Sequence, residues 1–361
     1  MLRLLAGLLL LGCGGLGEAS ESAQGGARVE RLPRAEPWPE ADALFRSDAR
    51  WRGGDAAVSV DLGHERVLWL FGDSFVAGDD TAPRGTRRGT VMVRNSIAIQ
   101  RGRDPESAAM RFIVRDGPAS FFPESGQRWY WPQHGILLEG RLTLFLYALV
   151  HDAGDPLGFR YDGWTALRVD NPGEQPEGWR IRPLQVPDVA PIEMVGASVL
   201  ADAEHVYAYG VREPGDHALF LLRWRRADFV ADALGDPERW AGASRGWTRG
   251  PPAAVLPRGQ TELSVVALGR RRYALAQTLG FGASRLALRL ASAPQGPFGD
   301  AIEIFEPPEH GRDGILIYGA RAHPELSGGE LVLTYNVNTL DAAALMDDLS
   351  IYFPRFVRVR F

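Results

Sequence analysis

The sequence contains no lysine, so all 40 of its basic residues are arginine. That absence excludes chemistry that depends on a lysine side chain, such as a phosphate-loop lysine, a Schiff base or a serine–lysine pair. The chain has a single cysteine, Cys13, which rules out an intrachain disulfide and a zinc site built from several thiolates. No H-E-x-x-H metalloprotease motif occurs either.

An excess of positive charge is also missing. The net charge is −5 and the isoelectric point is near 5.9, so neither a nucleic acid nor an anionic membrane surface would attract the chain. With 45% hydrophobic and 24% charged residues, the 361-residue chain has enough apolar material for a core. We expect a monomeric globular protein without a nucleic-acid partner.

Long hydrophobic runs are lacking except at the N-terminus. Residues 1–11 hold one arginine and then a leucine-rich run, which is too short to span a bilayer as a mature helix. The L-L-G-C run that ends at Cys13 resembles the processing box of bacterial lipoproteins. We predict a signal peptide over 1–12, lipidation of Cys13, a flexible tether over 13–27 and one folded domain over 28–361.

The predicted location follows from this N-terminus. Gly14 after the cysteine, by resemblance to lipoprotein sorting rules, favours the outer membrane or the cell surface. A plain cleaved signal peptide with a chance cysteine is the alternative, and it would make the protein periplasmic or secreted. In either case the protein is predicted to be exported, with membrane contact only through its lipidated N-terminus.

One pattern recurs from about residue 55 onward: a short apolar strand, a tight polar turn, a longer apolar strand and another β-rich run. The spacing is roughly 60 to 80 residues, wider than a WD40 blade but typical of propellers. The predicted hairpins cover 56–75, 135–149, 196–212, 261–278 and 320–338, and the β-rich runs cover 95–100, 163–169, 218–226, 284–292 and 353–361. We therefore predict an all-β fold, a five-bladed β-propeller.

A strand from the N-terminal side is predicted to close the last blade, because the fifth repeat reaches Phe361 after three strands. Segments 28–33 and 43–51 are the candidates for this strand. Short helices are predicted only at 228–235 and 341–349.

A carboxylate stands at the tip of a buried strand. Residues 67–76 read V-L-W-L-F-G-D-S-F-V and predict a continuous apolar strand that ends abruptly at Gly72-Asp73-Ser74, with Asp73 at its tip. Asp55 begins the preceding strand of the same antiparallel hairpin, so both aspartates are expected at one end. Two carboxylates facing one cavity are what glycoside hydrolysis requires. The alternative for each aspartate is a turn residue that caps its own loop.

Polar and aromatic residues are predicted around the same mouth of the central channel. Amides, arginine and an aromatic face suit the hydroxyl groups and the apolar side of a sugar ring. The predicted substrate-binding residues are Asn95, Trp131, Gln133, His134, Glu262, Arg321, His323 and Asn336. Alternatives remain for several: Glu262 could pair with Arg321, the histidines could be core residues, and the asparagines could satisfy backbone groups.

Several motifs resemble one bacterial family. They are W-L-F-G-D-S-F (69–75), R-N-S-I-A-I (94–99), S-A-P-Q-G-P-F (292–298), Y-G-A-R-A-H-P-E-L (318–326), L-T-Y-N-V-N (333–338) and Y-F-P-R-F (352–356). That family comprises exported five-bladed propellers long known only as a domain of unknown function, and it includes endo-D-arabinanases. It is more distantly similar to furanosidase propellers such as arabinanases and fructosidases.

The resemblance implies that Asp55 and Asp73 are the catalytic pair, with Asp55 as the base-like carboxylate and Asp73 as the acid. The wider furanosidase pattern also has an auxiliary aspartate in the second blade and an acid glutamate in the third. Here the second blade offers Gln133 and His134 instead, and the third offers only Glu193.

The leading hypothesis is therefore a glycoside hydrolase that cleaves a furanose-containing polysaccharide, such as D-arabinan, and requires no cofactor. A non-catalytic glycan-binding lipoprotein on the same scaffold is the alternative from another class. A third hypothesis, a docking platform for protein assembly, predicts an apolar mouth. Paired carboxylates distinguish the first hypothesis, because holding two negative charges together costs electrostatic energy that a binding protein has no reason to spend.

Overall fold

The computed structural model describes residues 32–361 apart from 79–82, 84, 115–116, 156 and 327–329. The predicted signal peptide, Cys13 and the predicted tether lie outside the described residues. In the described part, no helix is long and apolar enough to cross a membrane. Strands dominate, so the prediction of an all-β fold is confirmed.

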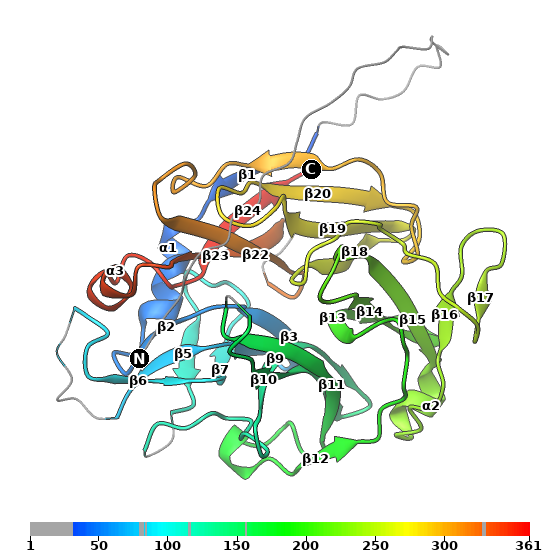
Figure 1. Ribbon diagram of the computed structural model, residues 1–361, viewed down its shortest axis with the longest axis horizontal. Coiled ribbons are helices and arrows are strands. Elements are labelled where there is room, and N and C mark those ends of the chain that lie inside the picture. The colour runs from blue at the N-terminus through cyan, green and yellow to red at the C-terminus, as the bar shows by residue number, and fades with distance from the viewer. Residues whose placement is uncertain (1–31, 79–82, 84, 115–116, 156, 327–329) are drawn as a thin grey trace, which may run out of the picture.

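Five sheets follow one another around a common centre (Figure 1). In chain order of their first strands they are β3 (Val58–Gly63), β4 (Arg66–Phe71), β7 (Ser96–Arg101) and β8 (Ala109–Phe112); β9 (Arg128–Leu138), β10 (Arg141–His151), β11 (Phe159–Val169) and β12 (Ile181–Leu184); β13 (Met194–Ala201), β14 (His205–Val211), β15 (Leu219–Arg225), β16 (Glu238–Trp240) and β17 (Trp247–Thr248); β18 (Ser264–Gly269), β19 (Arg272–Thr278), β20 (Leu286–Ala291) and β21 (Ile302–Phe305); and β22 (Ile315–His323), β23 (Leu331–Thr339), β24 (Arg355–Arg360) and β1 (Arg34–Pro37).

The first strand of each sheet lies innermost and contacts the first strands of its neighbours. Thus β3 contacts β9, β9 contacts β13, β13 contacts β18, β18 contacts β22, and β22 contacts β3 again. Each first strand also pairs with the second strand of its own sheet, so all five predicted hairpins are confirmed.

The core lies between the faces of adjacent sheets, and β4 shows why its sequence is apolar throughout. Trp69 and Phe71 pack in a cluster with Phe356 of the last sheet, whereas Leu68 and Leu70 pack in a cluster with residues of the second sheet. Successive side chains of a strand point to opposite faces, so a strand buried on both faces needs an uninterrupted apolar run.

The strand that completes the last sheet is β1, which pairs antiparallel with β24 from Arg34↔Arg360 to Pro37↔Val357. The prediction of an N-terminal strand is confirmed, but both predicted segments were wrong for the part that is described. Segment 43–51 instead begins with a 3₁₀ helix, η1 (Ala43–Arg46), which follows the short helix α1 (Pro39–Asp42). Proline at the start of α1 presets the helical φ angle there.

The predicted end of the apolar strand at Gly72-Asp73-Ser74 is confirmed, but the small sheet that follows it was not predicted. Strand β4 ends at Phe71, and the chain enters a separate small sheet of β2 (Trp51–Gly54), β5 (Ser74–Ala77) and β6 (Thr90–Val93). The two residues between β4 and β5, Gly72 and Asp73, therefore lie at the junction of two sheets.

The remaining elements are short. Helix α2 (Arg226–Val230) overlaps the predicted segment 228–235, and α3 (Ala342–Asp347) lies within 341–349. Asp341 caps α3 by accepting hydrogen bonds from the backbone N–H groups of Ala343 and Ala344. One further 3₁₀ turn, η2 (Pro176–Gly178), precedes β12.

Candidate functional site

The structure brings Asp55 and Asp73 together, as the hairpin predicted. The same register continues on both sides of them: Val58 pairs with Leu70 in the first sheet, and Gly54 pairs with Ser74 in the small sheet. Between these pairs, the N–H of Gly72 donates a 3.1 Å hydrogen bond to the carbonyl oxygen of Asp55. The two carboxylates are thus held opposite each other where both sheets end.

The approach is close enough to require glycine at position 72. A Cβ there would stand 2.6 Å from Oδ1 of Asp55, well inside van der Waals contact. The turn is fixed further by Ser74, whose hydroxyl donates to the Gly72 carbonyl oxygen at 2.9 Å. Ala56 and Ala57 both have positive φ angles, 69° and 48°, which are strained for residues with a Cβ and direct the chain into β3.

Asp73 is held by two donors. The indole N–H of Trp131 donates to Oδ1 at 3.0 Å, and the guanidinium of Arg94 contacts Oδ2 at 3.3 Å. Its side chain is only 17% exposed. Burial raises the pKa of Asp73, whereas the charge of Arg94 and the hydrogen bonds from Arg94 and Trp131 oppose that rise. These donors favour the ionised carboxylate.

Asp55 has a different environment. Its partner is the hydroxyl of Tyr318 on β22, which donates to Oδ2 at 2.8 Å. Burial raises the pKa of Asp55 well above its ordinary value, the negative charges of Glu262 and Asp73 raise it further, and the Tyr318 hydrogen bond only partly opposes this. Asp55 is therefore the carboxyl group that keeps its proton.

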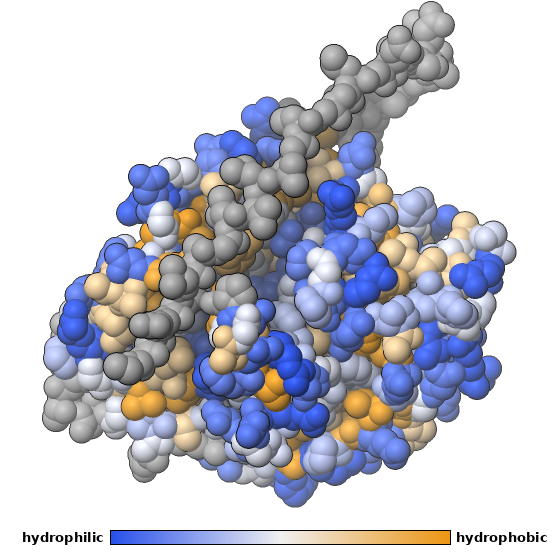
Figure 2. Space-filling model, viewed as in Figure 1, coloured by the Kyte–Doolittle hydropathy of each residue, from blue (hydrophilic) through white to orange (hydrophobic). Residues whose placement is uncertain are grey.

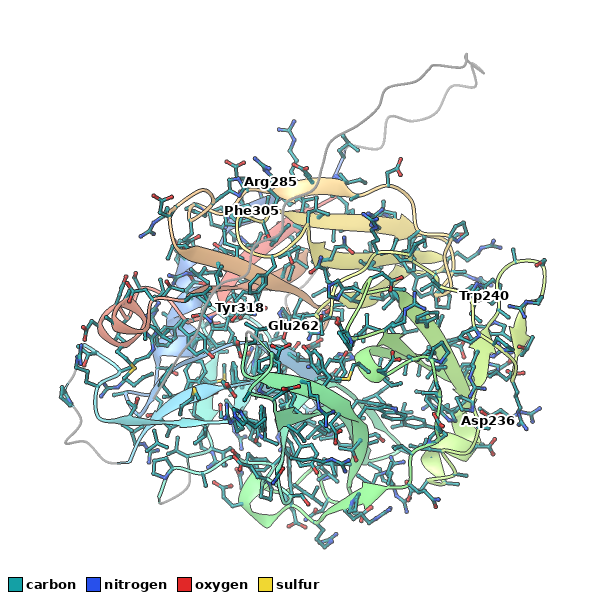
Figure 3. All side chains as sticks on the ribbon, in the orientation of Figure 1. Asp236, Trp240, Glu262, Arg285, Phe305 and Tyr318 are labelled. Atoms are coloured by element: carbon teal, nitrogen blue, oxygen red, sulfur yellow. The ribbon has the colours of Figure 1, made fainter. Side chains whose placement is uncertain are left out.

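Tyr318 and Glu262 lie near the centre of the surrounding sheets (Figure 3). Burial raises the pKa of Glu262, and Arg321 opposes the rise. Oε1 of Glu262 lies 3.9 Å from the Arg321 guanidinium, so the two form a long ion pair. The other oxygen, Oε2, is buried without a hydrogen-bond partner in the part of the chain that the structure describes.

Arg321 joins three sheets at the base of this site. Its fully buried guanidinium donates to the carbonyl oxygens of Ala197 and Leu263, both at 2.7 Å, and to the side-chain oxygen of Gln133 at 2.8 Å. The side-chain oxygen of Gln133 is therefore engaged in a hydrogen bond with Arg321.

The two predicted asparagines differ. Asn95 donates to the carbonyl oxygens of Phe122 and Tyr130 and accepts from the Phe122 N–H, so its amide supports the loop next to the mouth. Asn336 is buried beside Glu262, and neither of its amide atoms has a hydrogen-bond partner among the described residues. Gly319 makes room for both groups, because a Cβ there would stand 2.3 Å from Oε2 of Glu262 and 2.5 Å from Nδ2 of Asn336.

The structure places His134 and His323 away from the acid pair. The ring of His323 is hydrogen-bonded to the hydroxyl groups of Ser59 at 2.6 Å and Thr334 at 2.8 Å. Nδ1 of His134 accepts a hydrogen bond from the Val199 N–H at 2.8 Å. Burial, followed by the positive charge of Arg321, lowers the pKa of His134 to about 4 and that of His323 to about 3, so both rings are neutral.

His134 and Ser59 line a separate cavity of about 300 Å³, and neither Asp55 nor Asp73 contributes to its lining. The strand bounds explain this separation. Because β22 begins at Ile315 rather than at residue 320, His323 is its last residue and lies at the far end of the channel from Tyr318.

Several residues of the site were not selected from the sequence. Arg94, Tyr318 and Tyr352, whose hydroxyl donates to the Asp73 carbonyl oxygen at 2.9 Å, all contact the acid pair. The signal was present, because each lies in one of the family motifs. Glu213 was also missed: its side chain is 4% exposed, and Oε1 lies 2.5 Å from both the Thr261 hydroxyl and Nδ1 of His217.

Glu213 belongs to the same face of the molecule. Burial raises the pKa of Tyr161 above its ordinary value, and the negative charge of Glu213 raises it further. Tyr161 in turn packs edge to face with Phe159, and Phe159 packs edge to face with Trp131, the donor to Asp73. An aromatic wall therefore extends from Asp73 toward Glu213.

Two other chemistries find no support in the described residues. No group of three or more histidine, cysteine, aspartate or glutamate side chains there could hold a metal ion. Residues 242–246 read G-A-S-R-G and match the G-x-S-x-G pattern of a nucleophile elbow, so the prediction that the chain lacks this pattern is wrong. They form an exposed turn between β16 and β17 and are not followed by a helix, so the elbow geometry is missing.

Several solved structures are similar to this chain in fold. A protein from Bacteroides ovatus ATCC 8483, provisionally described as a hydrolase, matches with a TM-score of 0.71 at 18% identity, over 91% of this chain and 90% of that one. The xylan β-1,4-xylosidase of Bacillus halodurans C-125 matches with a TM-score of 0.50 at 11% identity, over 87% of this chain and 53% of that one. An α-L-arabinofuranosidase of Podospora anserina has a TM-score of 0.47 at 9% identity, over 91% of this chain and 97% of that one.

The chain thus shares an all-β propeller fold with glycoside hydrolases, and at these identities the likeness is one of fold alone. The chain belongs to the family described as Domain of unknown function (DUF5005), whose model matches residues 40–360. None of the curated proteins matches it.

Proposed function

We propose that this protein is a glycoside hydrolase built on a five-bladed β-propeller, in which each of the five large sheets is one blade. The observation that carries the proposal is the pair of buried aspartates with opposite environments. Asp55 is surrounded by negative charge, and Asp73 is held by Arg94 and Trp131. Two carboxyl groups whose surroundings separate their protonation states are the usual basis of acid–base assignment in such enzymes.

The environments reverse the roles that the family resemblance implies. Protonated Asp55 donates its proton to the glycosidic oxygen as the bond to the anomeric carbon breaks. Ionised Asp73 acts on the anomeric carbon, either directly as a nucleophile or by taking a proton from the attacking water. Tyr318 orients the carboxyl group of Asp55, and Arg94 keeps Asp73 charged.

A sugar substrate fits the rest of the site. Trp131, Phe159 and Tyr161 offer an aromatic wall beside Asp73 for the apolar side of a ring. Glu262 and Asn336 have buried polar atoms without partners among the described residues, and sugar hydroxyl groups would pair with them. We propose a furanose-containing polysaccharide, with D-arabinan as the first candidate, and an exported, lipid-anchored protein as the N-terminal sequence predicts.

The test is reducing-sugar release from D-arabinan, L-arabinan, fructan, galactan and, as a pyranose polymer, xylan. Asp55→Asn and Asp73→Asn are compared with Asp300→Asn, a substitution at an exposed aspartate. Hydrolysis of one furanose polymer by the wild type and by Asp300→Asn, with at least about a thousandfold loss in both site variants, is the expected result.

Two results would decide against this function. Full activity in either site variant would remove that aspartate from the mechanism. Binding of a polymer without hydrolysis, equal in wild type and both variants, would instead identify a non-catalytic glycan-binding protein. Thermal unfolding of each variant shows whether the fold is intact.

A further inference from the structure

Phe281 is an exposed aromatic residue held next to the acid pair. It lies in the loop between β19 and β20, and the residue is 64% exposed. The loop is joined to β22 by two backbone hydrogen bonds: Ile317 N–H to the Gly282 carbonyl oxygen at 2.8 Å, and Gly282 N–H to the Ile317 carbonyl oxygen at 3.3 Å. The backbone next to the ring is therefore fixed to the strand that carries Tyr318.

The ring of Phe281 packs on Tyr318, with centroids 5.3 Å apart and planes inclined at 43°. Tyr318 donates directly to Oδ2 of Asp55. An isolated exposed apolar residue needs no explanation. Phe281, however, contacts the tyrosine that hydrogen-bonds the proposed acid Asp55, so its ring adds exposed aromatic surface next to the acid pair.

On the Asp73 side, the surface is hollowed. A cavity of about 320 Å³ is lined by Arg94, by Glu124 and by the apolar side chains of Met92 and Pro123. Arg94 also contacts Asp73, and the charge of Glu124 contributes to raising the pKa of Asp73, so the cavity adjoins the acid pair. The face of the molecule seen in Figure 2 carries both hydrophilic and hydrophobic side chains.

We propose that the site binds an extended glycan chain rather than a single terminal sugar, with Phe281 stacking on a sugar on the Asp55 side and the cavity beside Arg94 accepting sugars on the Asp73 side. This inference rests on the proposed function. An aromatic ring on one side of the acids and an open cavity on the other leave room for chain in both directions. Cleavage within a polymer then follows.

The test is binding, measured by isothermal titration calorimetry in the Asp55→Asn background so that no substrate is consumed. The probes are D-arabinan, L-arabinan, their oligosaccharides and the free monosaccharides. Phe281→Ala is expected to weaken binding of polymer and oligosaccharides by about tenfold, and of the monosaccharide by less, whereas Phe281→Trp keeps an aromatic surface and restores affinity.

Phe361→Ala is the matched control, because Phe361 is also an exposed phenylalanine, at 45%, but lies at the C-terminus. The product pattern of the active enzyme is the second readout: a mixture of oligosaccharides early in the reaction supports the inference, and release of single sugars only would overturn it. Equal binding by Phe281→Ala and Phe361→Ala would overturn the role of Phe281.

These outcomes separate the inference from the proposed function. Hydrolysis that does not respond to Phe281→Ala would support the proposed hydrolase and contradict the proposed role of Phe281 in binding the glycan chain. Binding that depends on Phe281 without any hydrolysis would support the proposed binding role of Phe281 and contradict the proposed hydrolase activity. If no probe is bound or cleaved, both proposals fail.

Discussion

Tyr318 donates a 2.8 Å hydrogen bond to Oδ2 of Asp55, although the two residues are 263 positions apart in the chain. Tyr318 belongs to the last large sheet, and Asp55 lies just before β3, the first strand of the first large sheet. The proposed acid therefore lies where the ring of sheets closes, and its protonation depends on residues contributed by several sheets. This arrangement leads to specific expectations for pH dependence and stability.

Glu262→Gln is expected to lower the upper pH limit of activity. The charge of Glu262 raises the pKa of Asp55, so its removal lets Asp55 lose its proton at a lower pH. Because the proposed mechanism needs protonated Asp55, the alkaline limb of the kcat/KM profile moves to lower pH while the acidic limb moves little. Glu193→Gln, at an exposed glutamate, is the control. An unchanged alkaline limb would mean that Asp55 is not the acid.

Arg94→Leu is expected to move the other limb. Arg94 opposes the rise in the pKa of Asp73, so without it Asp73 keeps its proton to a higher pH. Activity would then fall at the acidic side, and the acidic limb of the kcat/KM profile would shift upward. Arg258→Leu, at an exposed arginine, supplies the comparison. A shift of the alkaline limb instead would restore the roles implied by the family resemblance.

Arg321→Leu is expected to destabilise the fold by about 3 to 5 kcal/mol, the usual cost of removing one partner from a buried ionic cluster. It leaves the carbonyl oxygens of Ala197 and Leu263 and the side chain of Gln133 without their donor. Urea unfolding measures the change. Arg258→Leu should remain within about 0.5 kcal/mol of the wild type. A similarly small effect at Arg321 would show that the three sheets do not depend on it.

Glu325→Gln is expected to stabilise the protein more at pH 8 than at pH 5. Burial raises the pKa of Glu325 from 4.5 to about 7, so the folded state binds more protons than the unfolded state between these values. Stability from this group is present at low pH and is lost as pH rises through 7. Glutamine cannot ionise, so the variant avoids that loss.

Thermal unfolding at the two pH values measures the Glu325 effect as a difference from the wild type. Differencing cancels the other titrating groups, including His134 and His323, whose lowered pKa values act in the opposite direction. A difference in Tm that is the same at both pH values would contradict the expectation.

Local patterns were sufficient to predict the hairpins and the meeting of the two aspartates. The apolar run of β4 is long because Trp69 and Leu70 face different sheets. The turn between β3 and β4 sets the register that places Asp55 opposite Asp73. The strand that resumes after the break at Gly72 could not be predicted in the same way. It exists because β5 pairs with β2 in a second sheet, and that pairing is not encoded in the hairpin.

The depth of each side chain in the channel was equally hard to predict. A strand rises about 3.3 Å per residue, so an error of a few residues in its start moves a side chain from one mouth toward the other. The strand that carries Trp131 and His134 begins at Arg128, not at residue 135. Trp131 therefore reaches Asp73, whereas His134 reaches the cavity at the far end.

The pairing of β1 with β24 links the first described strand to the last. Arg34 reaches its partner Arg360 only after more than 300 intervening residues have been synthesised. Contacts between such distant segments form late, because a long loop must be closed before they contribute. The last sheet therefore remains incomplete until β24 has been synthesised, and the nascent chain stays open at the edge where Tyr318 will later meet Asp55.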